Sequence, residues 1–265
     1  MNLVYPWRDA PAADFAVIGD PVSHSRSPAM HRAAYAAMDL TYSYIAVQVN
    51  SGEVAEALEH LRDLGLRGVN VTVPHKLEAL EWSEFPDDLA IRAGAANTID
   101  LGSRRSTITD GAGFLDTLEE MGVAAKSNIH LLGAGGTARA LAAILPDAGF
   151  RVSIWNRGRE RAEELAQTFR LESVLVEPNL DCDVVVNTTS IGLTGDRLPI
   201  DWSRRSANLI AYDLLYGNTA FLNEAKSNGL TTIDGLPLLV AQGARSIKWW
   251  LGLEPPRIAM MEAVK

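Results

Sequence analysis

The chain has 265 residues, of which 47% are hydrophobic and 22% charged, which is the balance of a folded globular protein rather than a disordered one. This length predicts two domains or one large one. The formal net charge of −9 argues against non-specific binding to nucleic acid or to an anionic membrane, although a local basic pocket for a small anion stays compatible with it. Cys182 is the only cysteine, which excludes an intrachain disulfide and a zinc site built from several thiolates.

Targeting and metal-binding signals are missing from the sequence. No uncharged stretch approaches the roughly 18 apolar residues of a membrane span, and residues 1–14 lack the apolar core of a secretory signal. We therefore expect a cytoplasmic protein without a membrane partner. The five histidines show neither an HExxH pattern nor paired ligand spacing, so we expect no dedicated metal site.

The first part of the chain alternates between β-rich runs and amphipathic helical stretches. Strands are expected at residues 15–18, 42–49 and 68–73, and helices from Pro28 onward and at 53–64. Ser27 suits the N-cap position of the helix that Pro28 begins, and Pro74 is expected to end the third strand. Two further runs, 97–101 and 106–109, are expected to pair as a hairpin.

A second series of strands and helices follows in the rest of the chain. Strands are expected at residues 129–132, 151–155, 173–176, 184–187, 209–212 and 230–233, and helices at 137–145, 159–169, 220–227 and from about Pro237 to Trp250. Strand–helix alternation predicts an α/β protein with mostly parallel sheets and helices on both faces. We place a domain boundary near residue 111. The last helix is expected to pack back on the first domain, because no partner strand follows it.

A glycine-rich loop lies between the predicted strand at 129–132 and the helix that follows. Residues 133–138 fit the dinucleotide-binding pattern G-x-G-x-x-A, and they are Gly133, Ala134, Gly135, Gly136, Thr137 and Ala138. The first glycine permits the tight turn, the second lets the backbone approach a pyrophosphate, and the alanine permits close helix–strand packing. The helix N-terminus offers unpaired N–H groups to the phosphates. A plain tight turn is the alternative, but the strand–turn–helix context favours nucleotide binding.

The end of the next predicted strand indicates which nucleotide is bound. An NAD site usually places an acidic residue there to hold the ribose 2′-hydroxyl, and residues 155–161 have none at the strand end. Because a guanidinium suits bidentate phosphate contact, Arg157 and Arg161 indicate a 2′-phosphate and therefore NADP. The alternative is a solvated helix start. Cations in a first helical turn oppose the helix dipole, however, so an anionic ligand explains them better.

Three polar clusters follow predicted strands of the first domain, where open α/β sheets bind ligands. They are residues 24–28, residues 70–76, and residues 97–98 together with 109–111. Capping explains Ser27 as well as a ligand does, but it does not explain Ser25. Pro74 leaves Lys76 at the C-terminal mouth of its strand. Each cluster alone is typical of a solvated loop, whereas together they supply hydroxyl, amide, ammonium and carboxylate groups suited to a small polyol acid.

Taken together, these motifs resemble those of the shikimate dehydrogenase family. The resemblance runs from about Phe15 to Gly252, nearly the whole chain. The segments that carry it are residues 17–28, 70–76, 94–98, 109–111, 133–138, 156–157, 186–190, 212–216 and 234–242. The combination is highly specific, unlike any one segment.

The resemblance implies a role for each matching residue. It implies that Lys76 and Asp110 are catalytic, with Tyr216 near the substrate. The hydroxyls and carboxylate of shikimate would be held by Ser25, Ser27, Thr72, Asn97, Asp110 and Gln242. The cofactor would be bound by residues 133–138 at the pyrophosphate, Asn156, Arg157 and Arg161 at the 2′-phosphoadenosine end, Thr188 and Ser190 on the nicotinamide side, and Gly235.

The resemblance also implies an architecture and a reaction. Two α/β domains are expected, with the active site in the cleft between them. Residues 1–110, completed by about 236–265, would bind substrate, and residues 111–235 would form a Rossmann-type NADP-binding domain. The expected reaction is the reversible reduction of the small-molecule substrate 3-dehydroshikimate by NADPH, on the chorismate route to aromatic amino acids, in a monomer or homodimer.

The sequence is also compatible with two other functions. One is a relative that acts on quinate or another cyclohexane polyol. The other is a non-catalytic sensor of the nucleotide or metabolite, against which the presence of both Lys76 and Asp110 argues. In the catalytic case the Lys76 ammonium donates to the oxygen that gains charge as hydride arrives, and Asp110 orients substrate and ammonium.

Two positions, one loop and the N-terminal segment depart from the family pattern. Gly158 stands where a threonine is usual, which removes one hydroxyl contact to a 2′-phosphate. Ile108 stands where an asparagine is usual, beside the predicted catalytic aspartate. The loop after Tyr216 looks shortened. The fourteen residues before Phe15 are longer than the family usually needs, and the sequence gives no function for them.

Overall fold

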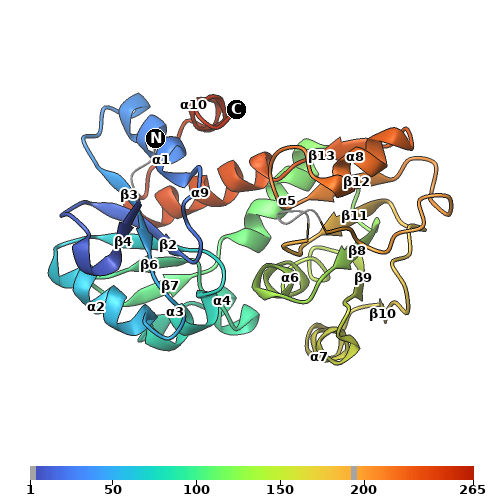
Figure 1. Cartoon of the computed structure of the whole chain (residues 1–265), viewed down its shortest axis with the longest axis horizontal. Coiled ribbons are helices and arrows are strands. Elements are labelled where there is room, and N and C mark those ends of the chain that lie inside the picture. Colours follow the sequence, from blue (N-terminus) through green and yellow to red (C-terminus); the bar gives the residue numbers. More distant parts are fainter. Residues whose placement is uncertain (1–3, 192–195) are drawn as a thin grey trace. The chain divides into compact units, whose positions relative to one another are not determined.

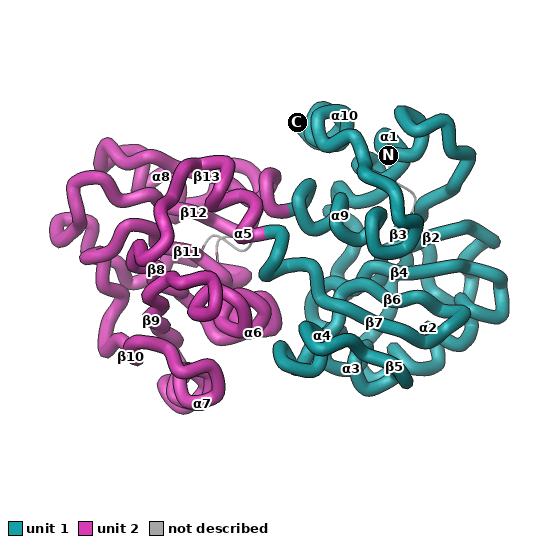
Figure 2. Tube along the Cα trace, turned by 180° about the vertical axis from the view of Figure 1, so that it is seen from behind, with its two compact units in different colours: residues 1–113, 239–265 teal, residues 114–238 magenta. Residues whose placement is uncertain are grey.

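A computed structural model describes residues 4–191 and 196–265 of the chain. Two compact units are present, one formed by residues up to Gly113 together with Leu239–Lys265 and the other by Phe114–Leu238 (Figure 2). Helices α5 (Asp110–Glu120) and α9 (Leu236–Leu251) each continue from one unit into the other. Among the described residues, no helix is long and apolar enough to cross a membrane.

The first unit is built on a seven-stranded sheet of order β1-β3-β2-β4-β6-β7-β5 (Figure 1). Its strands are β1 (Val4–Pro6), β2 (Phe15–Gly19), β3 (Tyr44–Gln48), β4 (Gly68–Val71), β5 (Phe85–Pro86), β6 (Thr98–Asp100) and β7 (Arg105–Thr107). Strands β1 to β4 pair in parallel, whereas β6 is antiparallel to both of its neighbours. The predicted hairpin is therefore confirmed.

Helices complete the first unit. They are α1 (Ser27–Ala37), α2 (Val54–Asp63), α3 (Lys76–Trp82), α4 (Asp88–Ala93), most of α9, α10 (Arg257–Glu262) and the short 3-10 helix η1 (Trp7–Asp9). Helix α2 shows why they form: Val54, Ala57, Leu58 and Leu61 recur at helical spacing and are all buried in one apolar cluster with the sheet. Strand β2 lies between β3 and β4, and all five of its residues are buried.

The second unit contains a six-stranded, fully parallel sheet of order β10-β9-β8-β11-β12-β13. Its strands are β8 (Asn128–Leu132), β9 (Arg151–Trp155), β10 (Ser173–Val174), β11 (Val184–Asn187), β12 (Ile210–Asp213) and β13 (Thr231–Ile233), and its helices are α6 (Gly136–Ala142), α7 (Arg159–Phe169), α8 (Ala220–Ser227) and the rest of α5. The chain winds from β8 outward to β9 and then back to β11 on the other side. Ligands of open α/β sheets bind at such a switch point.

Several local expectations are wrong in the first unit. The expected strand over residues 68–73 ends at Val71, before Pro74, and Lys76 is the first residue of α3. Ser27 is not the N-cap of α1, because Arg26 occupies that position. The Ser27 N–H instead donates a hydrogen bond to Ser25 Oγ at 3.3 Å. A local turn from Ser25 to Ser27 therefore replaces the expected side-chain cap.

The segment before Phe15 has a structural function that the sequence did not reveal. Strand β1 extends the sheet by pairing in parallel with β3. Trp7 of η1 is buried in the apolar cluster of the first unit, and its Nε1 donates to Glu53 Oε2 at 3.2 Å. This segment therefore covers the edge of β3 and one end of α2.

Candidate active site

Two neighbouring loops and the start of α1 carry three of the predicted substrate-binding residues. The loop after β2 holds Ser25 and leads into α1, whose first residue is Ser27, and the loop after β4 holds Thr72. The Thr72 N–H donates to the Ile18 carbonyl at 2.9 Å, so the second loop begins against the end of β2. Gly19 permits this approach, because a Cβ there would lie 2.4 Å from Thr72 Cγ2.

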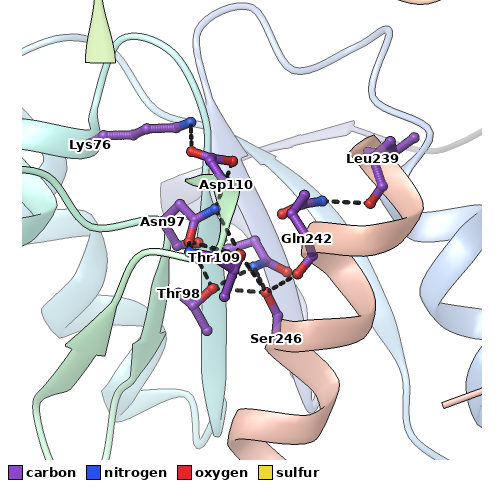
Figure 3. A network of polar contacts seen from close by, with 9 residues as sticks. Lys76, Asn97, Thr98, Thr109, Asp110, Leu239, Gln242 and Ser246 are labelled. Carbon is purple, nitrogen blue, oxygen red and sulfur yellow. Dashed lines mark hydrogen bonds and ion pairs between the residues drawn. The ribbon is translucent and has the colours of Figure 1, made fainter. Parts of the chain in front are cut away.

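Lys76 and Asp110 form a buried ion pair in the first unit. Lys76 Nζ lies 2.6 Å from Asp110 Oδ2, and the two side chains are only 9% and 8% exposed. Each residue is the first of its helix, α3 or α5, and the two side chains point toward one another (Figure 3). A buried pair of this kind costs desolvation free energy unless further hydrogen bonds satisfy the charges.

Asn97 provides such a hydrogen bond. Its Nδ2 donates to Asp110 Oδ1 at 3.0 Å and to Thr109 Oγ1 at 3.0 Å, while its Oδ1 accepts from the Thr109 N–H at 2.9 Å. The backbone N–H can only donate, so it fixes which end of the amide faces Asp110. Asp110 thus receives one hydrogen bond on each carboxylate oxygen, from the ammonium and from the amide.

Gln242 lies on α9 near the same cluster (Figure 3). Its Nε2 donates to the Leu239 carbonyl at 2.8 Å, and its side chain is half-buried. Gly113 of α5 permits close packing here, because a Cβ on it would lie 2.8 Å from the Gln242 backbone nitrogen. The close approach of α5 to α9 therefore sets the position of Gln242.

Tyr216 belongs to the second unit and follows β12. The loop that carries it is held by Asp213, whose Oδ1 accepts from the Leu215 N–H at 3.0 Å and whose Oδ2 accepts from Thr219 Oγ1 at 2.6 Å. Burial raises the pKa of Asp213. Tyr216 itself is half-buried. The structure thus gathers Lys76, Asn97 and Asp110 into one cluster and places Tyr216 in the other unit.

The glycine-rich loop of the second unit contains one glycine that close packing requires and one that faces open space. Gly133 has φ +115°, and a Cβ on it would lie 2.6 Å from Thr188 Oγ1, so only glycine fits. Gly135 is different, because nothing lies within 4 Å of the place where its Cβ would be. The backbone at Gly135 is therefore open to a ligand, while Ala138 is buried in the helix that follows. These features fit a pyrophosphate-binding loop.

The residues that follow β9 form a second polar segment, at the end of the strand next to β8. Asn156 Nδ2 donates to the Gly158 carbonyl at 2.8 Å, and Gly158 is the N-cap of α7 without a side-chain cap. Arg157 and Arg161 are both exposed. Two guanidinium groups and an amide thus lie at the carboxyl end of β9, beside the strand that leads into the glycine-rich loop.

Three other predicted cofactor residues have packing roles or lie at the edge of the described chain. Thr188 Oγ1 donates to the Leu132 carbonyl at 2.8 Å, which holds the end of β11 against the end of β8. Gly235 is required by close packing, since a Cβ would lie 2.2 Å from the Leu214 carbonyl oxygen. Ser190 is exposed just before the undescribed residues. No cluster of three or more metal-ligating side chains occurs within residues 4–191 and 196–265.

Sequence reasoning did not single out two residues, Tyr44 and Ser246, that support the Lys76–Asp110 cluster through Asn70 and its neighbours. Tyr44 OH donates to Asn70 Oδ1 at 2.8 Å, and Asn70 Nδ2 donates to Ser246 Oγ at 2.9 Å. One signal was available: Ser246 follows Gln242 by four residues, which places both on one face of a helix. The pairing of residue 70 with residue 246 has no local signal.

Three family models match the chain. They describe the shikimate dehydrogenase substrate binding domain over residues 17–99, shikimate/quinate 5-dehydrogenase over residues 117–193, and the shikimate 5′-dehydrogenase C-terminal domain over residues 235–265. Together these matches cover strands and helices of both units.

Individual relatives match over nearly their full length. A shikimate dehydrogenase (NADP(+)) of Methanocella arvoryzae is 39% identical over 256 residues, which cover 91% of this chain and 94% of the relative. Its counterpart in Moorella thermoacetica is 41% identical over 271 residues, which cover 94% of this chain and 91% of the relative. The crystal structure of shikimate 5-dehydrogenase from Thermus thermophilus, in complex with NADP(H) and shikimate, superposes with a TM-score of 0.87 at 39% identity and covers 94% of this chain and 97% of its own.

Proposed function

The chain belongs to the shikimate dehydrogenase family, and we propose that it catalyses the reversible, NADP-dependent interconversion of shikimate and 3-dehydroshikimate. The observation that carries the proposal is the buried Lys76–Asp110 pair, in which Asn97 binds the second carboxylate oxygen. An ammonium and a carboxylate held in direct contact inside a protein are suited to handle one proton of a bound hydroxyl or ketone.

We propose that the first unit binds the substrate. Ser25 and Thr72 offer hydroxyl groups from two loops that are hydrogen-bonded to each other, and Ser27 offers one from the start of α1. Asn97 and Gln242 offer amides near the ion pair (Figure 3). Hydroxyl and amide groups match the three hydroxyls and the carboxylate of shikimate, because each can donate or accept a hydrogen bond. Tyr216, from the second unit, is proposed as a further substrate-binding residue.

Lys76 and Asp110 would handle the proton. In the direction of reduction, the Lys76 ammonium donates to the ketone oxygen as that oxygen gains negative charge. Asp110 binds the same ammonium and keeps it directed at the substrate, and Asn97 keeps the carboxylate from rotating away. In the direction of oxidation, the same groups accept the hydroxyl proton.

The second unit would bind NADP. NADPH supplies the hydride when it is bound. The backbone at Gly135 would contact the pyrophosphate, because this glycine is open to its surroundings. Asn156, Arg157 and Arg161 would bind the 2′-phosphoadenosine end, and Thr188, Ser190 and Gly235 would line the rest of the cofactor site. We place this enzyme in the cytoplasm, in the chorismate route to aromatic amino acids.

The experiment that tests this function is an absorbance assay for reduced nicotinamide, with shikimate and quinate each offered alongside NADP and NAD. We expect turnover with shikimate and NADP. Lys76→Ala should lower kcat by about 10²–10⁴-fold while shikimate affinity, measured by calorimetry, falls far less. Lys248→Ala is a matched control, because this lysine is exposed and pairs with Glu254. Its kcat should equal that of the parent chain.

Three other outcomes would contradict parts of the proposal. Faster turnover of quinate than of shikimate would assign the substrate to a related cyclohexane polyol. Binding of nucleotide and shikimate without turnover would indicate a sensor rather than an enzyme. A Lys76→Ala variant with kcat within a fewfold of the parent would remove Lys76 from catalysis.

A further inference from the structure

Polar side chains that no predicted role explains are buried beneath the Lys76–Asp110 pair. Tyr44 on β3, Asn70 on β4 and Ser246 on α9 are enclosed in the first unit. Buried polar groups of this kind lower stability unless each finds a partner. All three are hydrogen-bonded to one another or to residues next to Asp110.

Ser246 is where these hydrogen bonds converge (Figure 3). Its Oγ donates to the Gln242 carbonyl at 3.0 Å and accepts from Asn70 Nδ2 at 2.9 Å. The same oxygen lies 2.8 Å from Thr98 Oγ1 and 3.4 Å from Thr109 Oγ1. One hydroxyl thus connects α9 with the strand end and the helix start that carry Asn97 and Asp110.

The direction of the hydrogen bonds in this network is set at both ends. Tyr44 OH donates to Asn70 Oδ1, which turns the Asn70 NH₂ group toward Ser246 and Thr98. Burial raises the pKa of Tyr44, so its hydroxyl keeps its proton. At the other end, the Thr109 N–H holds Asn97 Oδ1. The orientations of the Asn70 and Asn97 amides are therefore fixed at the two ends of the network.

We infer that Ser246 is a positioning residue for the proposed reaction: it supports Thr98 and Thr109, which hold the Asn97 amide against Asp110. The inference rests on the proposed function. Thr98 Oγ1 lies 3.0 Å from Asn97 Oδ1 and 2.8 Å from Ser246 Oγ, and Thr109 Oγ1 accepts from Asn97 Nδ2 at 3.0 Å. Because Ser246 donates its one proton to the Gln242 carbonyl, the one proton of Thr98 is shared between Asn97 and Ser246. Both hydroxyls that contact Asn97 therefore also contact Ser246. Ser246 therefore acts on Asp110 indirectly, through Thr98, Thr109 and Asn97.

Ser246→Ala tests the inference. We expect kcat for shikimate oxidation to fall about five- to tenfold, which is the effect of one buried hydrogen bond. The KM values for shikimate and NADP should stay within about twofold, because Gln242 remains in the same helix and no group that contacts substrate is removed. A purely structural role would lower the melting temperature and leave kcat unchanged.

Ser106→Ala is the matched control. Ser106 lies on β7 of the same sheet, is fully buried, and donates to Ser83 Oγ at 2.8 Å outside this network. Its loss also removes one buried hydroxyl, so it should lower the melting temperature by a similar amount. Its kcat should match that of the parent chain.

Substitutions at Thr98 provide a second test that does not depend on the folding of the Ser246 variant. Thr98→Val removes the hydroxyl and keeps the shape, and it should lower kcat as Ser246→Ala does. Thr98→Ser retains the hydroxyl and should restore most of kcat. Combined with Ser246→Ala, Thr98→Val should lower kcat little further than either single change, because both break the same chain of hydrogen bonds.

The outcomes separate this inference from the proposed function. No turnover by the parent chain overturns both. This inference alone is overturned if the parent chain turns over shikimate, Lys76→Ala abolishes that turnover, and Ser246→Ala and Thr98→Val both keep kcat within twofold of the parent. An equal fall in kcat for Ser106→Ala also overturns it, since that result assigns the effect to general destabilisation.

Discussion

The arginines at the start of α7 differ in the partners available to them. Arg159 Nε donates to Glu163 Oε1 at 2.6 Å, one turn further along the helix. Arg157 and Arg161 are exposed on either side of it. A cation in the first helical turn is disfavoured by the helix dipole, and a bound anion reverses that preference. Arg157 and Arg161 are therefore the better candidates for a 2′-phosphate.

Replacing Arg157 and Arg161 together with Ala should raise the KM for NADP and leave the KM for NAD almost unchanged. Losing one charge-assisted hydrogen bond costs about 1.5–3 kcal/mol, which corresponds to about 10–150-fold in affinity. Steady-state kinetics with both cofactors measures the effect. Arg159→Ala is the control and should change neither KM. Equal changes for NADP and NAD in the double variant would place these arginines away from the 2′-phosphate.

The glycine-rich loop contains two glycines with different structural constraints. Gly133 has a positive φ and packs against Thr188 Oγ1, so its lack of a side chain serves the fold. Gly135 has an extended backbone and open space around it, so its lack of a side chain serves a ligand. The two glycines therefore have different roles: Gly133 is needed for folding, whereas Gly135 is expected to bind the cofactor.

This difference predicts distinct phenotypes for two similar substitutions. Gly133→Ala should lower the melting temperature, because a side chain at φ +115° is strained and meets Thr188. Gly135→Ala should keep the melting temperature of the apoprotein and weaken NADP binding at least tenfold, because the methyl group occupies the space that the pyrophosphate needs. Thermal unfolding and calorimetry measure the two effects. Tight NADP binding by Gly135→Ala would mean that the nucleotide does not approach this backbone.

Sequence patterns predicted the second unit better than the first. Strands β9 and β11 and helices α7 and α8 have the bounds that periodicity predicts. Each of these elements is long enough for its apolar spacing to be visible. In the first unit α3 and α4 have only seven and six residues, too short for a clear period. Helix α4 nevertheless carries local signals, since Asp87 caps its start and Gly94 ends it with φ 62°.

The candidate site was predictable only where its residues occur in local motifs. Lys76 and Asp110 lie in segments that were recognisable from the sequence, and the structure brings their side chains together. Their roles in the reaction stay predictions until kinetics tests them. Tyr44 and Ser246 could not be found, because neither lies in a recognisable local motif and the contact between Asn70 and Ser246 spans 176 positions. Such a contact exists only once the sheet and α9 have packed.

The stability of the whole molecule depends on polar groups that folding encloses in its core. His31 on α1 stacks on Tyr44 with ring centroids 4.1 Å apart and also lies beside Tyr35 and Trp250. Its Nε2 is buried without a hydrogen-bond partner. Burial lowers the pKa of His31 from 6.5 to about 3, because a charged imidazole would lose its hydration there. The native protein therefore requires His31 in its neutral form.

This requirement predicts a stability that falls as the solution is acidified. Between pH 6.5 and about 3 the unfolded chain binds a proton at His31 that the folded chain does not, so the free energy of unfolding decreases as the pH falls. From pH 7 to pH 5 the contribution is about 2 kcal/mol. His31→Phe removes the titrating group and keeps an aromatic ring against Tyr44. Urea unfolding at pH 7 and pH 5 measures this effect. The decrease in the free energy of unfolding between these pH values should be about 2 kcal/mol smaller for the variant than for the parent chain. At pH 8, where His31 is neutral in both states, the difference between the two proteins reflects packing alone and serves as the reference. An equal loss on acidification in the parent and in His31→Phe would show that His31 is not the group that folding keeps neutral.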